Sequence, residues 1–179
     1  MANVSLDRET NYIKVFDLTE IINGEEVMAP SPFSKHQRII FKLAYLIKKH
    51  IEKSEIGEIF ISPLDVILEE GVNRLQPDLI FIKNENLHIV QDWIRGVPDA
   101  VVEVVSENSF TLDTVIKKEI YERYGVKEFW LVFPPEKVIQ IYTLQDGHYK
   151  LFNFAEQSGT VSSKIIEGLE LSLEEVFQE

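Results

Sequence analysis

The chain has 179 residues, 45% of them apolar, with no cysteine and a formal net charge of −12. This composition is that of a soluble globular protein, and the length predicts a single domain over residues 1–179. The absence of cysteine excludes disulfides and thiolate chemistry. Without a signal peptide or an apolar run long enough to span a bilayer, we expect a cytoplasmic protein and no membrane contact.

The charge is unevenly distributed along the chain. Residues 156–179 carry a local charge of −5, whereas residues 34–53 carry a local charge of +5. An acidic surface repels phosphates, so the net charge alone argues against non-specific nucleic-acid binding. The basic segment 34–53 weakens this argument, because it does not repel phosphates.

The first elements are short. Tyr12–Phe16 alternates weakly and predicts a short strand, and the pair Asn23-Gly24 predicts a hairpin turn between two apolar pairs. Ser34 is a candidate N-cap for an amphipathic helix that runs to about Glu52. Its basic side chains are either a solvated face or a surface for phosphates, and those nearest its start are Lys35, Arg38 and Lys42.

The middle of the chain alternates apolar runs with turns. The runs at 79–82, 101–105 and 129–133 lack polar alternation, which is typical of strands covered on both faces. A helix predicted over Leu112–Tyr124 separates the last two runs and gives a strand–helix–strand unit. Together with later hairpins, this pattern predicts an α/β (α+β) fold with a central mixed sheet flanked by helices and antiparallel hairpins.

Two carboxylates stand at strand positions. Asp78 follows Pro77 at the mouth of one strand, and Glu103 lies within the apolar run 101–105. Burying an ionised carboxylate is costly unless a cation, a metal or hydrogen bonds compensate it. Mg²⁺ prefers one or two carboxylates plus water and phosphate oxygens, so the pair suits metal-assisted phosphodiester hydrolysis.

The helix that follows Glu103 carries Asp113, Lys117 and Tyr121 at four-residue spacing, which stacks them on one face. Lys117 is therefore a candidate for positioning a water or stabilising developing charge. The plain alternatives are an ordinary ion pair between Asp113 and Lys117, a core role for Tyr121, and a structural ion pair for Glu103.

Taken in order, these residues resemble a known family. The segments that carry the resemblance are IINGEEVMAPSP, SPLDVIL, QPDLIFI, GVPDAVVEVVS, the Asp113–Tyr121 helix, GVKEFWLVFP and EGLELSL. They are similar to a prokaryotic family of restriction-endonuclease-like proteins, known as a domain of unknown function, within the PD-(D/E)xK nuclease superfamily. The resemblance covers most of the chain and implies a restriction-endonuclease-like core.

The resemblance also implies a reaction and a set of roles. It implies a Mg²⁺-dependent or Mn²⁺-dependent endonuclease that acts on DNA as a homodimer. Asp78, Glu103 and the Val104 carbonyl would hold the metal, and Asp78, Glu103 and Lys117 would be catalytic. One departure from the superfamily pattern is Val105, which stands where the motif has its Lys. In the narrower family the helix supplies that Lys, and Lys117 matches it.

Four further residues are candidates with two readings each. Glu25 matches an early acidic position of the family or is an exposed hairpin residue. His36 contacts phosphate or water or is a partly buried, satisfied histidine. Asp65 is a ligand or supports one. Asp99 is a ligand or a turn acceptor at a strand start.

Two rival functions stay open. One is a non-catalytic nucleic-acid-binding or regulatory protein on the same fold, which the acidic charge favours. The other is a metal hydrolase for small molecules. Retention of Asp78, Glu103 and Lys117 together argues against the first rival.

Overall fold

The computed structural model describes residues 18–28 and 33–178, so the strand predicted over Tyr12–Phe16 lies outside the described residues. The strands are β1 (Thr19–Ile22), β2 (Glu25–Met28), β3 (Gly57–Ile61), β4 (Val66–Glu69), β5 (Asn73–Leu75), β6 (Leu79–Lys83), β7 (Ile94–Arg95), β8 (Ala100–Val104), β9 (Glu128–Phe133), β10 (Val138–Gln145), β11 (His148–Glu156), β12 (Thr160–Ser162) and β13 (Glu170–Ser172). The helices are α1 (Ser34–Ser54), the 3-10 helix η1 (Asn84–Ile89), the π-helix η2 (Leu112–Lys117), α2 (Lys118–Tyr124) and α3 (Leu173–Val176).

The main sheet has six strands in the order β11-β10-β9-β8-β6-β3. Strands β8 and β9 are parallel and joined by η2 and α2, whereas β6 runs antiparallel to β8. This confirms the predicted strand–helix–strand unit and the mixed central sheet. The β10–β11 hairpin turns at Asp146-Gly147, where both residues have the positive φ that a tight hairpin needs.

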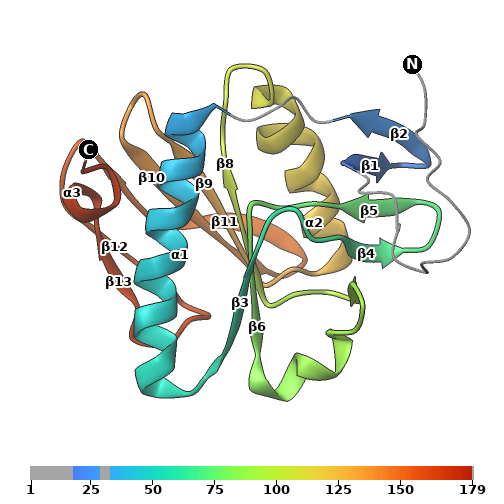
Figure 1. Ribbon diagram of the computed structural model, residues 1–179, viewed down its shortest axis with the longest axis horizontal. Coiled ribbons are helices and arrows are strands. Elements are labelled where there is room, and N and C mark those ends of the chain that lie inside the picture. The colour runs from blue at the N-terminus through green and yellow to red at the C-terminus, as the bar shows by residue number, and fades with distance from the viewer. Residues whose placement is uncertain (1–17, 29–32, 179) are drawn as a thin grey trace, which may run out of the picture.

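A second sheet of five strands, in the order β2-β1-β5-β4-β7, lies beside α2 (Figure 1). Its β1–β2 hairpin turns at Asn23-Gly24 as predicted. The short pair β12–β13 and α3 lie on the opposite side of the molecule (Figure 1). Within residues 18–28 and 33–178, no helix is both long and apolar enough to cross a lipid bilayer.

The helices cover opposite faces of the main sheet. One core cluster joins the apolar face of α1 to Val102, Val104 and Trp130, and another joins Ile120 and Tyr121 of α2 to the neighbouring positions of β8 and β9. Because side chains alternate along a strand, the two clusters lie on the two faces of the sheet. A carboxylate within β8 thus lies between buried layers.

The helical boundaries differ from the prediction in two places. Phe33, not Ser34, is the N-cap residue of α1, and no side chain caps that end. The helix after β8 starts with α-helical Phe110 and Thr111, is π-helical over Leu112–Lys117 and returns to α-helix at Lys118. Thr114 donates its hydroxyl to the Phe110 carbonyl (2.6 Å), a bond that competes with the regular α-helical pattern. Such π-turns often mark functional sites.

Candidate functional site

The strand register brings the two predicted carboxylates together. Leu79 of β6 lies opposite Val102 of β8 in an antiparallel pair, so Asp78 comes beside Glu103. The backbone amide of Val104 donates a hydrogen bond to Asp78 Oδ2 (2.7 Å). Asp78 thus lies against the same short piece of β8 that carries Glu103.

The helix after β8 brings its polar side chains to Glu103. The Tyr121 hydroxyl donates to Glu103 Oε1 (2.8 Å), and Lys117 Nζ lies 3.4 Å from the same oxygen. Lys117 Nζ also lies 3.7 Å from Asp113 Oδ1. All four side chains are buried, so these contacts form a cluster within the protein, shielded from solvent.

Glu20 completes this cluster and is the residue that sequence reasoning missed. It reaches the cluster from β1 of the second sheet. Its Oε1 lies 2.9 Å from Lys117 Nζ and accepts a hydrogen bond from the backbone amide of Gln76 (2.6 Å). Its Oε2 is buried without a hydrogen-bond partner among the described residues. The available signal was the hairpin: with the turn at Asn23-Gly24, Glu20 shares the inward face of Ile22.

The cluster carries more negative than positive charge. The Lys117 ammonium faces three carboxylates, Glu20, Glu103 and Asp113, and Asp78 lies beside them against His36. Burial raises the pKa of Glu103 well above its usual value, and the neighbouring carboxylates add to that rise while Lys117 opposes it. Burial likewise raises the pKa of Asp113 to about 6. A group of acids that hold protons this tightly favours an additional cation.

The pKa of Lys117 is also raised, but for a different reason. Burial alone would lower the pKa of Lys117, but the surrounding Glu103, Glu20 and Asp113 carboxylates outweigh burial and raise it. The side chain therefore stays an ammonium at every physiological pH. It can donate hydrogen bonds and neutralise charge, but it cannot take a proton from water.

His36 lies at the edge of the cluster. Its Nε2 is 3.3 Å from Asp78 Oδ2, so the first turn of α1 touches the candidate metal-binding side chain. Burial lowers the pKa of His36, but hydrogen bonding and charge from Asp78, with the Val104 backbone, outweigh burial and raise it. The histidine is thus partly buried, with Nε2 against a carboxylate, whereas its Nδ1 is buried without a hydrogen-bond partner among the described residues.

The donor chemistry fits a hard divalent cation. The cluster offers carboxylate oxygens, an excess of negative charge and one orphaned buried oxygen, Glu20 Oε2. Within the described part of the chain, no three His, Asp or Glu side chains are already arranged as a metal site. Mg²⁺ needs only one or two carboxylates beside water and substrate oxygens, so the Asp78–Glu103 pair meets its requirement.

Three other predicted residues lie elsewhere. Glu25 is exposed on β2, opposite Ile22 in the register, and Glu20 takes the inward position. Asp65 is buried against Arg74 and accepts a hydrogen bond from the Gln76 side chain (2.7 Å). Asp99 lies at the start of β8, at the other end of the strand from Glu103, and binds Lys127 Nζ (2.8 Å).

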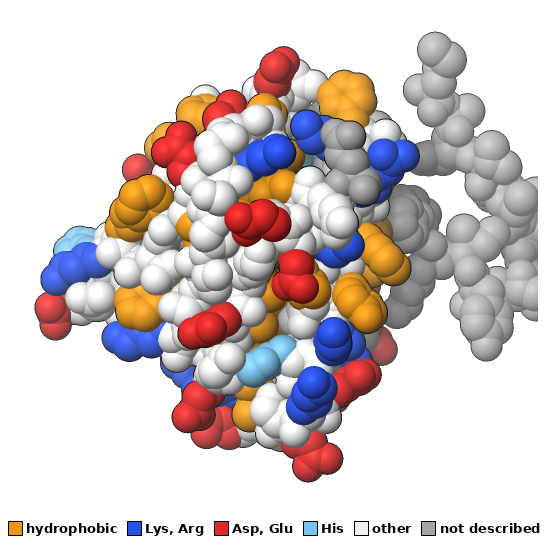
Figure 2. Space-filling model, turned by 90° about the vertical axis from the view of Figure 1, so that its left-hand side faces the viewer, with side chains coloured by type: hydrophobic (Ala, Val, Ile, Leu, Met, Phe, Trp, Pro, Cys, Tyr) orange, Lys and Arg blue, Asp and Glu red, His pale blue; other side chains and the backbone are white. Residues whose placement is uncertain are grey.

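The basic side chains follow α1. Lys35 and Arg38 lie in the same helical turn as His36 and are exposed. Lys42 lies one turn further on and is partly buried. Figure 2 shows Lys and Arg side chains mainly along one side of the visible face, with Asp and Glu between them. The basic surface is therefore a stripe, not a broad patch.

The comparisons with known proteins agree on one family. No protein with a curated description matches the chain. A crystal structure of a putative nuclease belonging to DUF820, from Anabaena variabilis, superposes with a TM-score of 0.73 at 21% identity and covers 89% of each chain, which confirms the predicted fold. The sequence pattern of the family Uma2, described as putative restriction endonuclease, matches residues 17–174. The chain therefore belongs to the Uma2 family of putative restriction endonucleases.

Proposed function

We propose that this protein is a Mg²⁺-dependent endonuclease that hydrolyses phosphodiester bonds of DNA. The observation that carries the proposal is the buried cluster of Glu20, Glu103 and Asp113 around Lys117, with the partly buried Asp78 beside Glu103, which together hold more carboxylates than the one lysine balances. The description of the Uma2 family supports the same reaction class.

Asp78, Glu103 and the Val104 carbonyl would hold the ion, which can be Mg²⁺ or Mn²⁺. In each of the two carboxylates, the donors found among the described residues contact one of the two oxygens. Val104 N and His36 contact Asp78 Oδ2, and Tyr121 and Lys117 contact Glu103 Oε1. This arrangement fixes each side chain and leaves its other oxygen for a cation. When bound, the ion makes a water more acidic and offsets charge that develops on the phosphate.

The remaining residues of the cluster hold Glu103 and Lys117 in position and neutralise charge. Tyr121 holds Glu103 in place, and Glu20 and Asp113 hold Lys117 beside it. Because the raised pKa keeps Lys117 protonated, its role is to orient a water or phosphate oxygen by donating a hydrogen bond, with no general-base step. His36 fixes Asp78 in the same way from α1.

The first turns of α1 are the proposed contact for the DNA backbone. His36 ties this end of the helix to Asp78, and the exposed Lys35 and Arg38 belong to the same turn of the helix as His36. Lys42 continues the stripe one turn further on. Cationic side chains there would offset the repulsion that the net charge of −12 imposes. A homodimer, which the superfamily resemblance implies, belongs to the same proposal and is tested by light scattering in solution.

One observation favours a second candidate, a non-catalytic nucleic-acid-binding or regulatory protein. Lys117 contacts Glu20, Glu103 and Asp113 together, as it would in a purely structural ion network. Such a network needs no metal, so the two functions differ in whether Mg²⁺ binds at the cluster.

The experiment is a cleavage assay with matched acidic variants. Supercoiled, linear and single-stranded DNA are incubated with Mg²⁺ or Mn²⁺ and with wild type, Glu103→Gln, Glu20→Gln or Glu25→Gln. We expect Glu103→Gln to lower the rate at least about 100-fold and Glu20→Gln to lower it clearly, because both side chains belong to the cluster. Glu25→Gln, which changes an exposed glutamate in the same hairpin, should cut as wild type does.

Two outcomes would count against the proposal. Cleavage that is unchanged in Glu103→Gln would place the reaction elsewhere or in a contaminant. A wild-type protein that cuts none of the three DNA forms with either ion would favour the non-catalytic alternative.

A further inference from the structure

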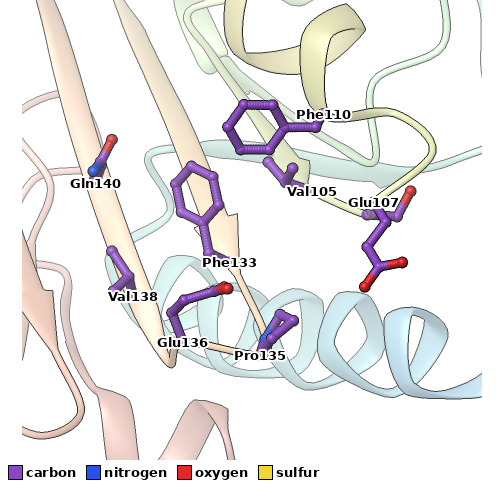
Figure 3. Close-up of a pocket in the computed structure, with 9 residues that line it drawn as sticks. Val105, Glu107, Phe110, Phe133, Pro135, Glu136, Val138 and Gln140 are labelled. Atoms are coloured by element: carbon purple, nitrogen blue, oxygen red, sulfur yellow. The ribbon is translucent and has the colours of Figure 1, made fainter.

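A pocket of about 350 Å³ is lined by residues that follow Glu103 and precede Asp113 in the chain, together with residues of β9, β10 and the turn between them (Figure 3). It begins where the cluster ends: Val105 and Ser106 continue the chain from Val104, and Phe110 precedes Asp113 by three residues. Because side chains alternate along a strand, Val105 lies on the same face of the sheet as Glu103. Phe133 and Val138 extend the wall along β9 and β10. The pocket is therefore a neighbour of the proposed phosphate site on the same face.

The pocket has an aromatic wall that is open to a ligand. The rings of Phe110 and Phe133 project toward one another (Figure 3), with centroids 6.3 Å apart and planes inclined by 49°. Phe110 is 53% exposed, although it lies within a few residues of buried Asp113. An exposed phenylalanine at the mouth of a pocket offers a π-face for stacking.

The polar groups of the pocket select among occupants. Glu107, Glu136 and Gln140 stand around the aromatic pair, and the two glutamates bring negative charge (Figure 3). Carboxylates repel a phosphate but accept hydrogen bonds from amino groups. The pocket thus suits a flat, neutral ring that carries an exocyclic amine.

We propose that this pocket binds a nucleobase next to the phosphate at the carboxylate cluster, with Phe110 as the stacking side chain and Glu107 and Glu136 as acceptors for an exocyclic amine. The proposal rests on the proposed function, because it takes nucleic acid as the ligand. A base can enter the pocket only when it is unstacked from its duplex or single-stranded. The protein therefore prefers single-stranded or locally opened DNA, and among bases it prefers those with an amine.

The first test measures binding without cleavage. Labelled single-stranded oligonucleotides are titrated in EDTA with wild type, Phe110→Ala, Phe110→Leu and, as a control, Phe152→Ala, which removes another exposed phenylalanine from β11. Loss of a base–aromatic stack weakens binding by about tenfold, so we expect that loss in Phe110→Ala and most of it in Phe110→Leu, which keeps the apolar bulk. Phe152→Ala should bind as wild type does. Thermal melting checks that all variants are folded.

The second test compares two pyrimidines of the same size. Oligo(dC) carries an exocyclic amine at C4 where oligo(dU) carries a carbonyl, and N3 is an acceptor in cytosine and an N–H in uracil, so only cytosine offers an exocyclic amine. We expect wild type to bind oligo(dC) several-fold more tightly, and the double variant Glu107→Gln with Glu136→Gln to lose that ratio. The ratio is the readout because removing two negative charges strengthens binding of every oligonucleotide.

The outcomes separate this inference from the proposed function. Equal affinities for Phe110→Ala and Phe152→Ala, or no binding of oligonucleotides by wild type, would overturn the pocket assignment even if DNA is cut. Binding that depends on Phe110 in a protein that cuts no DNA would keep the pocket assignment and reject the nuclease. An unchanged dC-to-dU ratio in the glutamine double variant would remove the acceptor role of the two glutamates.

Discussion

Strand β8 has a buried acid near each end, and the two ends are opposite in their electrostatics. At its start, Asp99 accepts hydrogen bonds from the Lys83 amide (2.8 Å), the Asn86 side chain and Lys127 Nζ (2.8 Å). Burial raises the pKa of Asp99, but these donors outweigh burial and lower it below its usual value. At the other end, Glu103 lies among acids and its pKa is raised well above its usual value, with burial as the main cause.

The difference separates a structural acid from a functional candidate. Donors outnumber acids around Asp99, so its charge is already compensated and it links β8 to η1 and β9. Around Glu103 the acids outnumber the cations, an arrangement that costs stability unless a ligand supplies charge. Perturbed acids of this kind concentrate at functional sites.

The largest effect on unfolding free energy is expected when the lysine beside Glu103 is replaced, and the lysine beside Asp99 provides the comparison. Lys117→Met leaves Glu20, Glu103 and Asp113 without their buried cation, and we expect it to cost about 3–5 kcal/mol of unfolding free energy near pH 8. Lys127→Met removes an ion pair whose lysine is half exposed, so it should cost less than about 1 kcal/mol. Urea unfolding of both variants measures the difference.

Protonation gives this prediction an internal check. At pH 5 Glu103 and Asp113 of Lys117→Met can take up protons, because their pKa values are already raised in the wild type, so the cost of this substitution should shrink there, while the cost of Lys127→Met stays small. Equal costs for the two variants at pH 8 would mean that the two ends of β8 do not differ as described.

The sequence was enough to predict most of the fold. Continuous apolar runs identified β6, β8 and β9, and the turn pairs Asn23-Gly24 and Asp146-Gly147 located two hairpins. The π-helix was not predicted, because helical periodicity does not distinguish a π-turn from an α-turn. Within it, the Thr114 hydroxyl bonds to the Phe110 carbonyl, a contact that the sequence alone does not show.

Sequence reasoning brought together Asp78, Glu103 and Lys117, which the structure places around one piece of β8. It missed Glu20: the hairpin alternation places this side chain on the inward face of β1, but the sequence does not show that the second sheet packs against α2 and brings Glu20 to Lys117. The partner of Asp99 could not be foreseen either, because Lys127 lies 28 residues away in the chain. Asp65 lies next to the cluster, since the Gln76 side chain binds Asp65 and the Gln76 backbone amide binds Glu20.

A smaller effect is expected in the pH dependence of stability, with opposite signs at the two ends. The pKa of Asp113 is about 6 in the folded protein against an ordinary 3.8, so the folded state binds its proton more tightly and stability falls as pH rises between these values. The pKa of Asp99 is lowered, so its contribution is present above 3.8 and is lost as pH falls below that value.

Asparagine variants test these signs. We expect Asp113→Asn to gain stability relative to wild type as the pH rises from 4 to 7, and Asp99→Asn to be less stable than wild type at pH 7 with a smaller deficit at pH 3. Unfolding free energies in EDTA across this range provide the measurement. If the curves of wild type and Asp113→Asn stay parallel, Asp113 does not titrate in the buried cluster.

The smallest expected effect is the exchange of protons for Mg²⁺, and it tests which end of β8 binds the ion. Metal ligands must be deprotonated, and the acids around Glu103 hold protons above their usual pKa, so Mg²⁺ binding near pH 6 should release roughly one proton and fewer at pH 8. Calorimetric titration in two buffers of different ionisation enthalpy measures this number. Asp99→Asn should bind Mg²⁺ and release protons as wild type does, and Glu103→Gln should lose both. Binding at exposed carboxylates would release almost no protons at pH 6, because such groups are already ionised. Mg²⁺ binding without proton release in wild type would therefore locate the ion away from Glu103.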